Sequence, residues 1–213
     1  KILFFIIGFS LKDKKNEKNF SSGIKLCNAL QSMGTTFIKL GQFLATRPDI
    51  IGEKTSKELE KLQDKLPAFD LSYAKNILKD ELGENNFNKI LDISKPIAAA
   101  SIAQVHFATI NVNEGSKKIA IKILRPNIEE IFNEELDALM LLAYIIQGLV
   151  KKTKRLKLVE IVQLLREITN VEMDLRFEAA AANELYENTK NDIGFKVPKI
   201  YWNYTSKKVL CLD

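Results

Sequence analysis

Cysteine and histidine, which build disulfide and metal sites, are scarce here: the 213-residue chain has two cysteines and one histidine. Cys27 and Cys211 stand far apart in the sequence, so neither a disulfide framework nor a Cys/His metal site is indicated. A reducing, cytoplasmic compartment fits this composition best. Glycine (nine) and proline (five) are also few, and 46% of the residues are hydrophobic, which excludes collagen-like, low-complexity and globally disordered chains.

Long hydrophobic runs are missing as well. The run from Ile2 to Phe9 has about eight residues and the run from Ala138 to Val150 about 13, whereas a spanning helix needs roughly 20. No cleavage site of a signal peptide follows the first run. We therefore expect neither run to cross a membrane, and we interpret the second as a buried helix.

Charge of one sign is only slightly in excess, with 32 basic and 27 acidic residues and a net charge of +5. This balance permits phosphate, nucleic-acid or anionic-membrane partners and does not choose among them. No cluster of Lys and Arg is interleaved with aromatic residues, as a nucleic-acid surface would require. We expect no nucleic-acid partner.

The hydrophobic pattern predicts an α+β fold. Apolar residues at spacings of three and four predict helices up to Pro48, over 54–66 and over 70–82, the last with Asp70 as N-cap and Gly83 as stop. Two β-rich runs, 102–110 and 117–124, predict a hairpin. The predicted order ends with two helices, over 129–151 and 158–190, and two strands, over 197–201 and 207–212.

This order predicts a helical extension over residues 1–94 and a second domain over 95–213. The sequence stops directly after the last apolar strand. Because domains rarely end on such a strand, we expect the chain to be a piece of a longer protein.

Lys122 is the first candidate for a functional site. Strand alternation places Ala120, Lys122 and Leu124 on one face of the second hairpin strand and three isoleucines on the other. A lysine between small and apolar neighbours needs a carboxylate or a phosphate; the alternative is an edge-strand lysine that reaches solvent. In kinases, Ala-x-Lys on such a strand places the small residue near adenine and the lysine at the α- and β-phosphates.

Three carboxylates on the predicted helix 158–190 are candidate partners for lysines. Asp174 and Glu178 are four residues apart and share a helix face, whereas Glu172 and Glu178 are six apart and about 120° from each other. The two glutamates would then serve different lysines. The alternative is an acidic face that only contacts solvent.

An alanine-rich segment, Ala98-Ala99-Ala100-Ser101, precedes the hairpin where a kinase would place a glycine-rich loop. Alanine disfavours positive φ and stiffens the backbone, so this loop would not drape over phosphates as a glycine loop does. The alternative is a helix or a packed turn without a ligand. We interpret the nearby His106 as a structural strand residue.

The early helix carries Lys39, Gly41 and Gln42. Gly41 costs a helix about 1 kcal/mol relative to Ala, which indicates close approach of another backbone. Lys39 and Gln42 are three residues apart and could enter one cleft, with an exposed helix face as the alternative.

Together these motifs resemble the UbiB family of atypical protein-kinase-like proteins, which is linked to ubiquinone (coenzyme Q) biosynthesis. The matching segments are Lys39-Leu40-Gly41-Gln42 for its K-x-G-Q signature, Ala98-Ala99-Ala100-Ser101 for its alanine-rich loop, Ala120-Ile121-Lys122 for its strand lysine, and Glu172-Met173-Asp174 for its E-x-D signature. The resemblance implies a protein-kinase-like N-lobe, with a small antiparallel sheet and an αC-like helix, and a helical extension laid across the cleft.

The resemblance also implies the roles of individual residues. Nucleotide binding would fall to Ala98, Ala99, Ala100, Ser101, Ala120 and Lys122. Lys122 would pair with Glu178 and Lys39 with Glu172, while Gln42 would face the nucleotide pocket. ATP and Mg are the implied cofactors, and ordinary protein phosphorylation is disfavoured because the extension occupies the space of a protein substrate.

The sequence departs from the family pattern in one respect. It has no catalytic-loop Asp with a downstream Asn and no Asp-Phe-Gly, and Asp192-Ile193-Gly194 reads as a turn. We therefore expect no catalytic residue and no metal ligand in this chain, which would be inactive alone.

The favoured function is the N-terminal portion of a UbiB-type atypical kinase or ATPase. The alternative is a truncated, non-catalytic interaction module of the ubiquinone-biosynthesis machinery or of the membrane surface. For either function we expect a cytoplasmic protein, with a peripheral position at the inner membrane as the other option.

Overall fold

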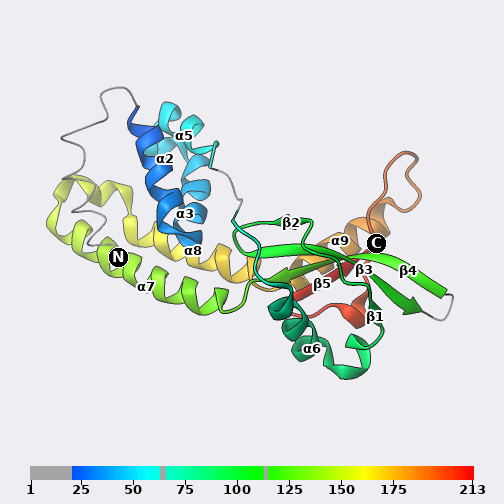
Figure 1. Cartoon of the computed structure of the whole chain (residues 1–213). Coiled ribbons are helices and arrows are strands. Elements are labelled where there is room, and N and C mark those ends of the chain that lie inside the picture. The colour runs from blue at the N-terminus through cyan, green and yellow to red at the C-terminus, as the bar shows by residue number, and fades with distance from the viewer. Residues whose placement is uncertain (1–20, 63–65, 113–114) are drawn as a thin grey trace. The chain divides into compact units, whose positions relative to one another are not determined.

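The structure is a computed structural model that describes residues 21–62, 66–112 and 115–213 (Figure 1). The apolar run from Ile2 to Phe9 lies outside the described residues. The chain divides into two compact units, Lys1–Gln63 and Asp64–Asp213.

The first unit is helical throughout its described part, with α2 (Ser22–Met33), α3 (Thr35–Ala45), α4 (Pro48–Ile51) and α5 (Glu53–Leu59). The single helix expected up to Pro48 is wrong, because Gly34 interrupts it with φ 115° and ψ −169°. Only glycine adopts this conformation without strain. The helix expected over 54–66 ends at Leu59, and residues 63–65 lie outside the described part.

The second unit contains an antiparallel sheet of β1 (Ile90–Leu91), β2 (Ala98–Ala99), β3 (Ala103–Val112), β4 (Gly115–Leu124) and β5 (Val209–Leu212). The strand order is β1-β3-β4-β5, and β2 also pairs with β3. The predicted hairpin is confirmed, with a register from Ala103 opposite Leu124 to Val112 opposite Gly115. The strand expected over 197–201 is wrong, since only Ile200 forms an isolated bridge, to Leu212.

One face of the sheet is buried under α6 (Leu71–Phe87). Ala74 and Leu78 of α6 share a core cluster with Ile90 and with the isoleucines of β4. Figure 1 shows α6 lying against the sheet. Asp70 caps α6 as predicted, since its carboxylate accepts a hydrogen bond from the Ser72 amide at 2.7 Å. The α+β fold class is confirmed. The compact units nevertheless divide at residue 63 and not near 95, because α6 and β1 belong to the core of the sheet.

The remaining helices of the second unit are α7 (Ile128–Leu149), η1 (Lys151–Leu156), α8 (Leu158–Glu172), α9 (Leu175–Thr189) and η2 (Trp202–Tyr204). The single helix expected over 158–190 is wrong: it breaks after Glu172, and Asp174 becomes the N-cap of α9. Glu172 and Glu178 therefore lie on two different helices, and the 120° relation between them does not hold. Within the described ranges, no helix is both long and apolar enough to cross a membrane.

Candidate functional site

Lys122 of β4 and Glu178 of α9 form an ion pair, with 2.7 Å between Nζ and Oε2. Their side chains are 28% and 50% exposed. An ion pair that is open to water contributes little to stability, so its effect is mainly to fix where the lysine points. The structure thus brings these two residues together, with α9 in the position of the αC-like helix.

The Lys122 face of the sheet carries apolar side chains from several strands. The register places Val105 opposite Lys122 and Phe107 opposite Ala120 on β3, with Leu212 opposite Ala120 on β5. Residues opposite each other in an antiparallel pair share a face. Phe107 is 56% exposed, whereas the isoleucines of the other face are buried. This face therefore offers an open apolar surface beside the Lys122 ammonium, which suits a flat apolar group that carries an anion.

The alanine-rich segment forms a short strand and a tight turn at this face. Ala98 pairs with Val105 and Ala99 with Gln104, and the Ala100 amide donates to the Ala103 carbonyl at 2.8 Å. Ser101 is buried in the turn, and none of these residues has a positive φ. The alternative of a helix is wrong, and the segment is a packed turn at the edge of the Lys122 face.

Two residues that the sequence analysis did not select hold this turn and the segment Pro67–Phe69. The Arg125 guanidinium donates from Nε and Nη2 to the Ala100 carbonyl, at 3.0 and 2.8 Å, and from Nη2 to the Pro67 carbonyl at 2.9 Å. Gln104 accepts from the Phe69 amide at 2.9 Å and donates to the Phe69 carbonyl at 3.2 Å. Gln104 could have been found from the sequence, because it is a polar residue at a strand position that shares the face of the buried isoleucines. Arg125 follows the last residue of β4, so the alternation of the strand gives no signal for it.

His106 is buried and both of its ring nitrogens have partners. Nδ1 lies 2.8 Å from the Ser94 carbonyl, and Nε2 lies 2.9 Å from the side-chain nitrogen of Gln104. Since a carbonyl only accepts, Nδ1 carries the proton and Nε2 accepts from Gln104. These contacts are those of a structural strand residue.

The hydrogen-bond partner of the Asp174 side chain is Arg176. The Asp174 carboxylate accepts from Arg176 Nε at 2.8 Å and Nη2 at 2.6 Å, and from the Arg176 amide at 3.1 Å. The hydrogen bonds from Arg176 hold the pKa of the Asp174 carboxyl below its usual value. Asp174 therefore begins α9, the helix that carries Glu178.

The K-x-G-Q residues lie on α3 of the first unit. A Cβ added at Gly41 would lie 2.9 Å from Leu30 Cδ1 and closer still to Leu62. Side chains, not the expected second backbone, therefore occupy the space beside Gly41. The pairing of Lys39 with Glu172 and the placement of Gln42 stay predictions.

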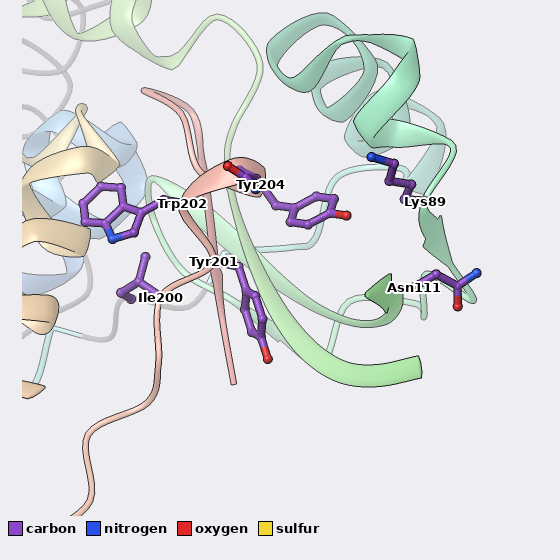
Figure 2. A pocket seen from close by; sticks show the side chains of 7 residues that line it. Lys89, Asn111, Ile200, Tyr201, Trp202 and Tyr204 are labelled. Atoms are coloured by element: carbon purple, nitrogen blue, oxygen red, sulfur yellow. The ribbon is translucent and has the colours of Figure 1, made fainter. Parts of the chain in front are cut away.

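A separate shallow pocket of about 380 Å³ lies beside η2, lined by Lys89, Asn111 and residues 200–204. Tyr204 points toward Lys89 and Asn111, whereas Trp202 lies on the opposite side of η2 (Figure 2). Tyr204 also packs in the core cluster with the isoleucines, so this pocket is not on the Lys122 face. In the described part of the chain, no three His, Cys, Asp or Glu side chains gather as a metal site would need.

Comparison with known proteins decides the family. Residues 61–213 match the family described as "ABC1 atypical kinase-like domain". The chain belongs to this family. The match begins close to the start of the second unit at Asp64, so the ABC1 domain includes α6 and β1 as well as the Lys122 face.

Curated relatives agree with this assignment. Proteins named "Probable protein kinase UbiB" are 35% identical over 198 residues in Marinobacter nauticus and 36% identical over 207 residues in Histophilus somni. These matches cover 92% and 96% of this chain but only 36% and 38% of the relatives. The resemblance to UbiB is confirmed, and the chain spans little more than a third of the length of these relatives.

Proposed function

We propose that the ABC1 domain of this chain binds ATP on the Lys122 face, as the N-terminal portion of a UbiB-type atypical kinase or ATPase that supports ubiquinone biosynthesis. The observation that carries the proposal is the 2.7 Å contact between Lys122 and Glu178 beside the open apolar face. The phosphoryl acceptor and the turnover of ATP belong to the whole protein.

Each group on this face has a defined task in the proposal. Lys122, aimed by Glu178, pairs with phosphate oxygens, and Ala120 and Val105 leave room for the flat base. The alanine-rich turn lies beside the phosphates. ATP supplies the phosphoryl group. Magnesium would arrive bound to the phosphates of ATP, as is usual for nucleotide sites.

Nucleotide titration of Lys122→Ala tests this proposal. Loss of the charge at the phosphates should weaken ATP binding at least about tenfold, as expected for a charge-assisted hydrogen bond. Lys207→Ala is the matched control, since Lys207 also pairs with a helix glutamate, Glu129, at 2.9 Å, without belonging to the Lys122 face. Calorimetric titration with MgATP measures both. Equal affinities in the wild type and Lys122→Ala would refute the site.

A second function, attachment to an anionic membrane surface, is favoured by one observation on α7. Leu141 and Leu149 are 62% and 80% exposed, and the exposed cations Lys154 and Arg155 follow in η1. Apolar side chains beside cations suit an interface with anionic lipid. Flotation with vesicles of anionic and of neutral lipid tests it, with Leu141→Ser/Leu149→Ser as the variant. If the wild-type protein floats with neither kind of vesicle, this function is excluded.

A further inference from the structure

Arg125 connects three segments of the second unit. Its guanidinium bonds the Ala100 carbonyl twice and the Pro67 carbonyl once, and it lies over the Phe69 ring at 5.8 Å from the ring centroid. Its backbone amide donates to the Ile102 carbonyl at 2.8 Å. The alanine-rich turn is therefore bound at both ends by one residue, which lies three positions after Lys122.

The segment Pro67–Phe69 is itself held in place. Both backbone groups of Phe69 are bonded by the side chain of Gln104, which is buried on β3. Gln104 is fixed in turn by its contact with His106. Arg125 consequently ties the turn to a segment that is anchored in the sheet, immediately before α6.

We propose that Arg125 is a positioning residue for nucleotide binding, which keeps the alanine-rich turn in one conformation by bridging Ala100 to Pro67. This inference rests on the proposed function. The turn has no glycine and is closed by the backbone bond from the Ala100 amide to the Ala103 carbonyl, but its sheet pairing covers only Ala98 and Ala99. The bonds from Arg125 tie this turn to Pro67 and to the end of β4. A turn that samples several conformations binds less tightly, because the apparent affinity falls with the fraction of competent protein.

The planar, forked guanidinium is needed for this bridge. It reaches two carbonyls at once and lies over an aromatic ring, whereas a lysine ammonium is a point charge on a flexible stem. Arg125→Lys therefore keeps the charge near the phosphates but loses the bridge. This variant separates positioning from simple attraction of an anion.

The experiment uses the intact chain with the variants Arg125→Lys and Arg125→Gln. Arg166→Gln is the matched control, because Arg166 also donates to a partner on another element, Asp137 at 2.7 Å, between α8 and α7. MgATP affinity is measured by calorimetric titration, and hydrogen exchange of the amides in residues 98–103 is followed without nucleotide. We expect both Arg125 variants to bind MgATP about tenfold more weakly and to exchange these amides faster, with Arg166→Gln unchanged in both.

The possible failures are distinguishable. If the wild type binds MgATP and Arg125→Lys binds it equally well, charge alone suffices and the positioning role is refuted while the proposed function stands. If exchange in residues 98–103 is unchanged in Arg125→Gln, the bridge does not hold the turn and the inference is also refuted. If the wild type itself does not bind MgATP, the proposed function fails, and the role of Arg125 in nucleotide binding fails with it.

Discussion

At the scale of single residues, position and burial separate the polar groups of the ABC1 domain into two kinds. Lys122 and Glu178 are partly exposed and gain little stability from each other, so their ion pair serves to orient the lysine. Gln104 and His106 are buried and bonded to each other, which makes them costly to replace. Substitutions at the first pair should therefore affect binding, and substitutions at the second should affect folding.

Cys211 gives a prediction on alkaline stability. Burial raises the pKa of its thiol to about 12, from an ordinary value of 9.0. The folded state thus favours the neutral thiol, and the stability that this contributes is complete below pH 9 and lost as the pH rises from 9 toward 12. The wild type should lose roughly 1 kcal/mol from this thiol between pH 9 and pH 10.

Urea unfolding of the wild type and Cys211→Ala at pH 8, 9 and 10 measures this contribution. The difference in the free energy of unfolding between the two proteins should shrink as the pH rises. Cys27→Ala in the other unit is a second test of the same effect, because burial raises the pKa of the Cys27 thiol as well and its difference should shrink in the same direction. A difference that stays constant from pH 8 to pH 10 would contradict the raised pKa.

The sequence predicted Lys122 and its partner Glu178 from the family motif, and the contact between them is present. It did not predict Arg125, because one arginine after a strand has no periodic signal and its partners are backbone carbonyls. Side-chain contacts to backbone groups that are distant in sequence follow from the folded chain and not from local pattern. The roles of Lys39, Gln42 and Glu172 stay predictions.

At the scale of secondary-structure elements, the start of α9 determines where Glu178 lies. Asp174 caps this helix, and Asp174→Ala should lower the free energy of unfolding by about 1 kcal/mol. Asp174→Asn keeps an oxygen acceptor and should cost less at neutral pH. Because the pKa of Asp174 is lowered, its charge contributes stability above the ordinary value of 3.8 and loses it as the pH falls further.

Urea unfolding at pH 7 and pH 3 checks both statements. The wild type should lose more stability than Asp174→Asn between these two pH values, since the asparagine does not titrate. An identical loss in both proteins would show that the charge of Asp174 has no stabilising role.

Gly34 divides α2 from α3, and its φ of 115° makes a second prediction at this scale. Gly34→Ala should destabilise the protein by roughly 1–3 kcal/mol through backbone strain alone, because nothing lies within 4 Å of the added Cβ. Gly148 in α7 is the matched control, with equally open space and no positive φ. Gly148→Ala should be neutral or stabilising by up to about 1 kcal/mol. Thermal unfolding of both variants measures the contrast, which equal shifts would contradict.

These breaks explain why elements were predicted unequally well. The hairpin was predicted correctly because alternation of apolar residues and turn residues are local signals, and these signals are enough to identify both of its strands. The helices up to Pro48 and over 158–190 were each predicted as one, because apolar spacing continues through Gly34 and Met173 while the backbone does not. The segment 197–201 has strand composition, but only Ile200 finds a partner.

At the scale of the whole molecule, the ABC1 domain includes more of the chain than its β-rich part. The family match begins at residue 61 and the second unit at Asp64, whereas the sequence pattern changes near residue 95. The sequence pattern marks where helices give way to strands. The hydrophobic core defines the extent of the domain, and it includes α6 and Ile90 because they bury the isoleucine face that the strands alone would leave open to water.

Shortened chains test this division. A chain of residues 64–213 should unfold in one cooperative transition, while a chain of residues 95–213 should lack one, because it loses Ala74, Leu78 and Ile90 from the core. Leu78→Ala in the intact chain is the milder form of the same change and should cost about 2–5 kcal/mol, as for other buried leucines. Near-ultraviolet circular dichroism during thermal unfolding distinguishes the two shortened chains. If residues 95–213 unfold as cooperatively as residues 64–213, α6 is an accessory to the sheet and the domain begins where its strands begin.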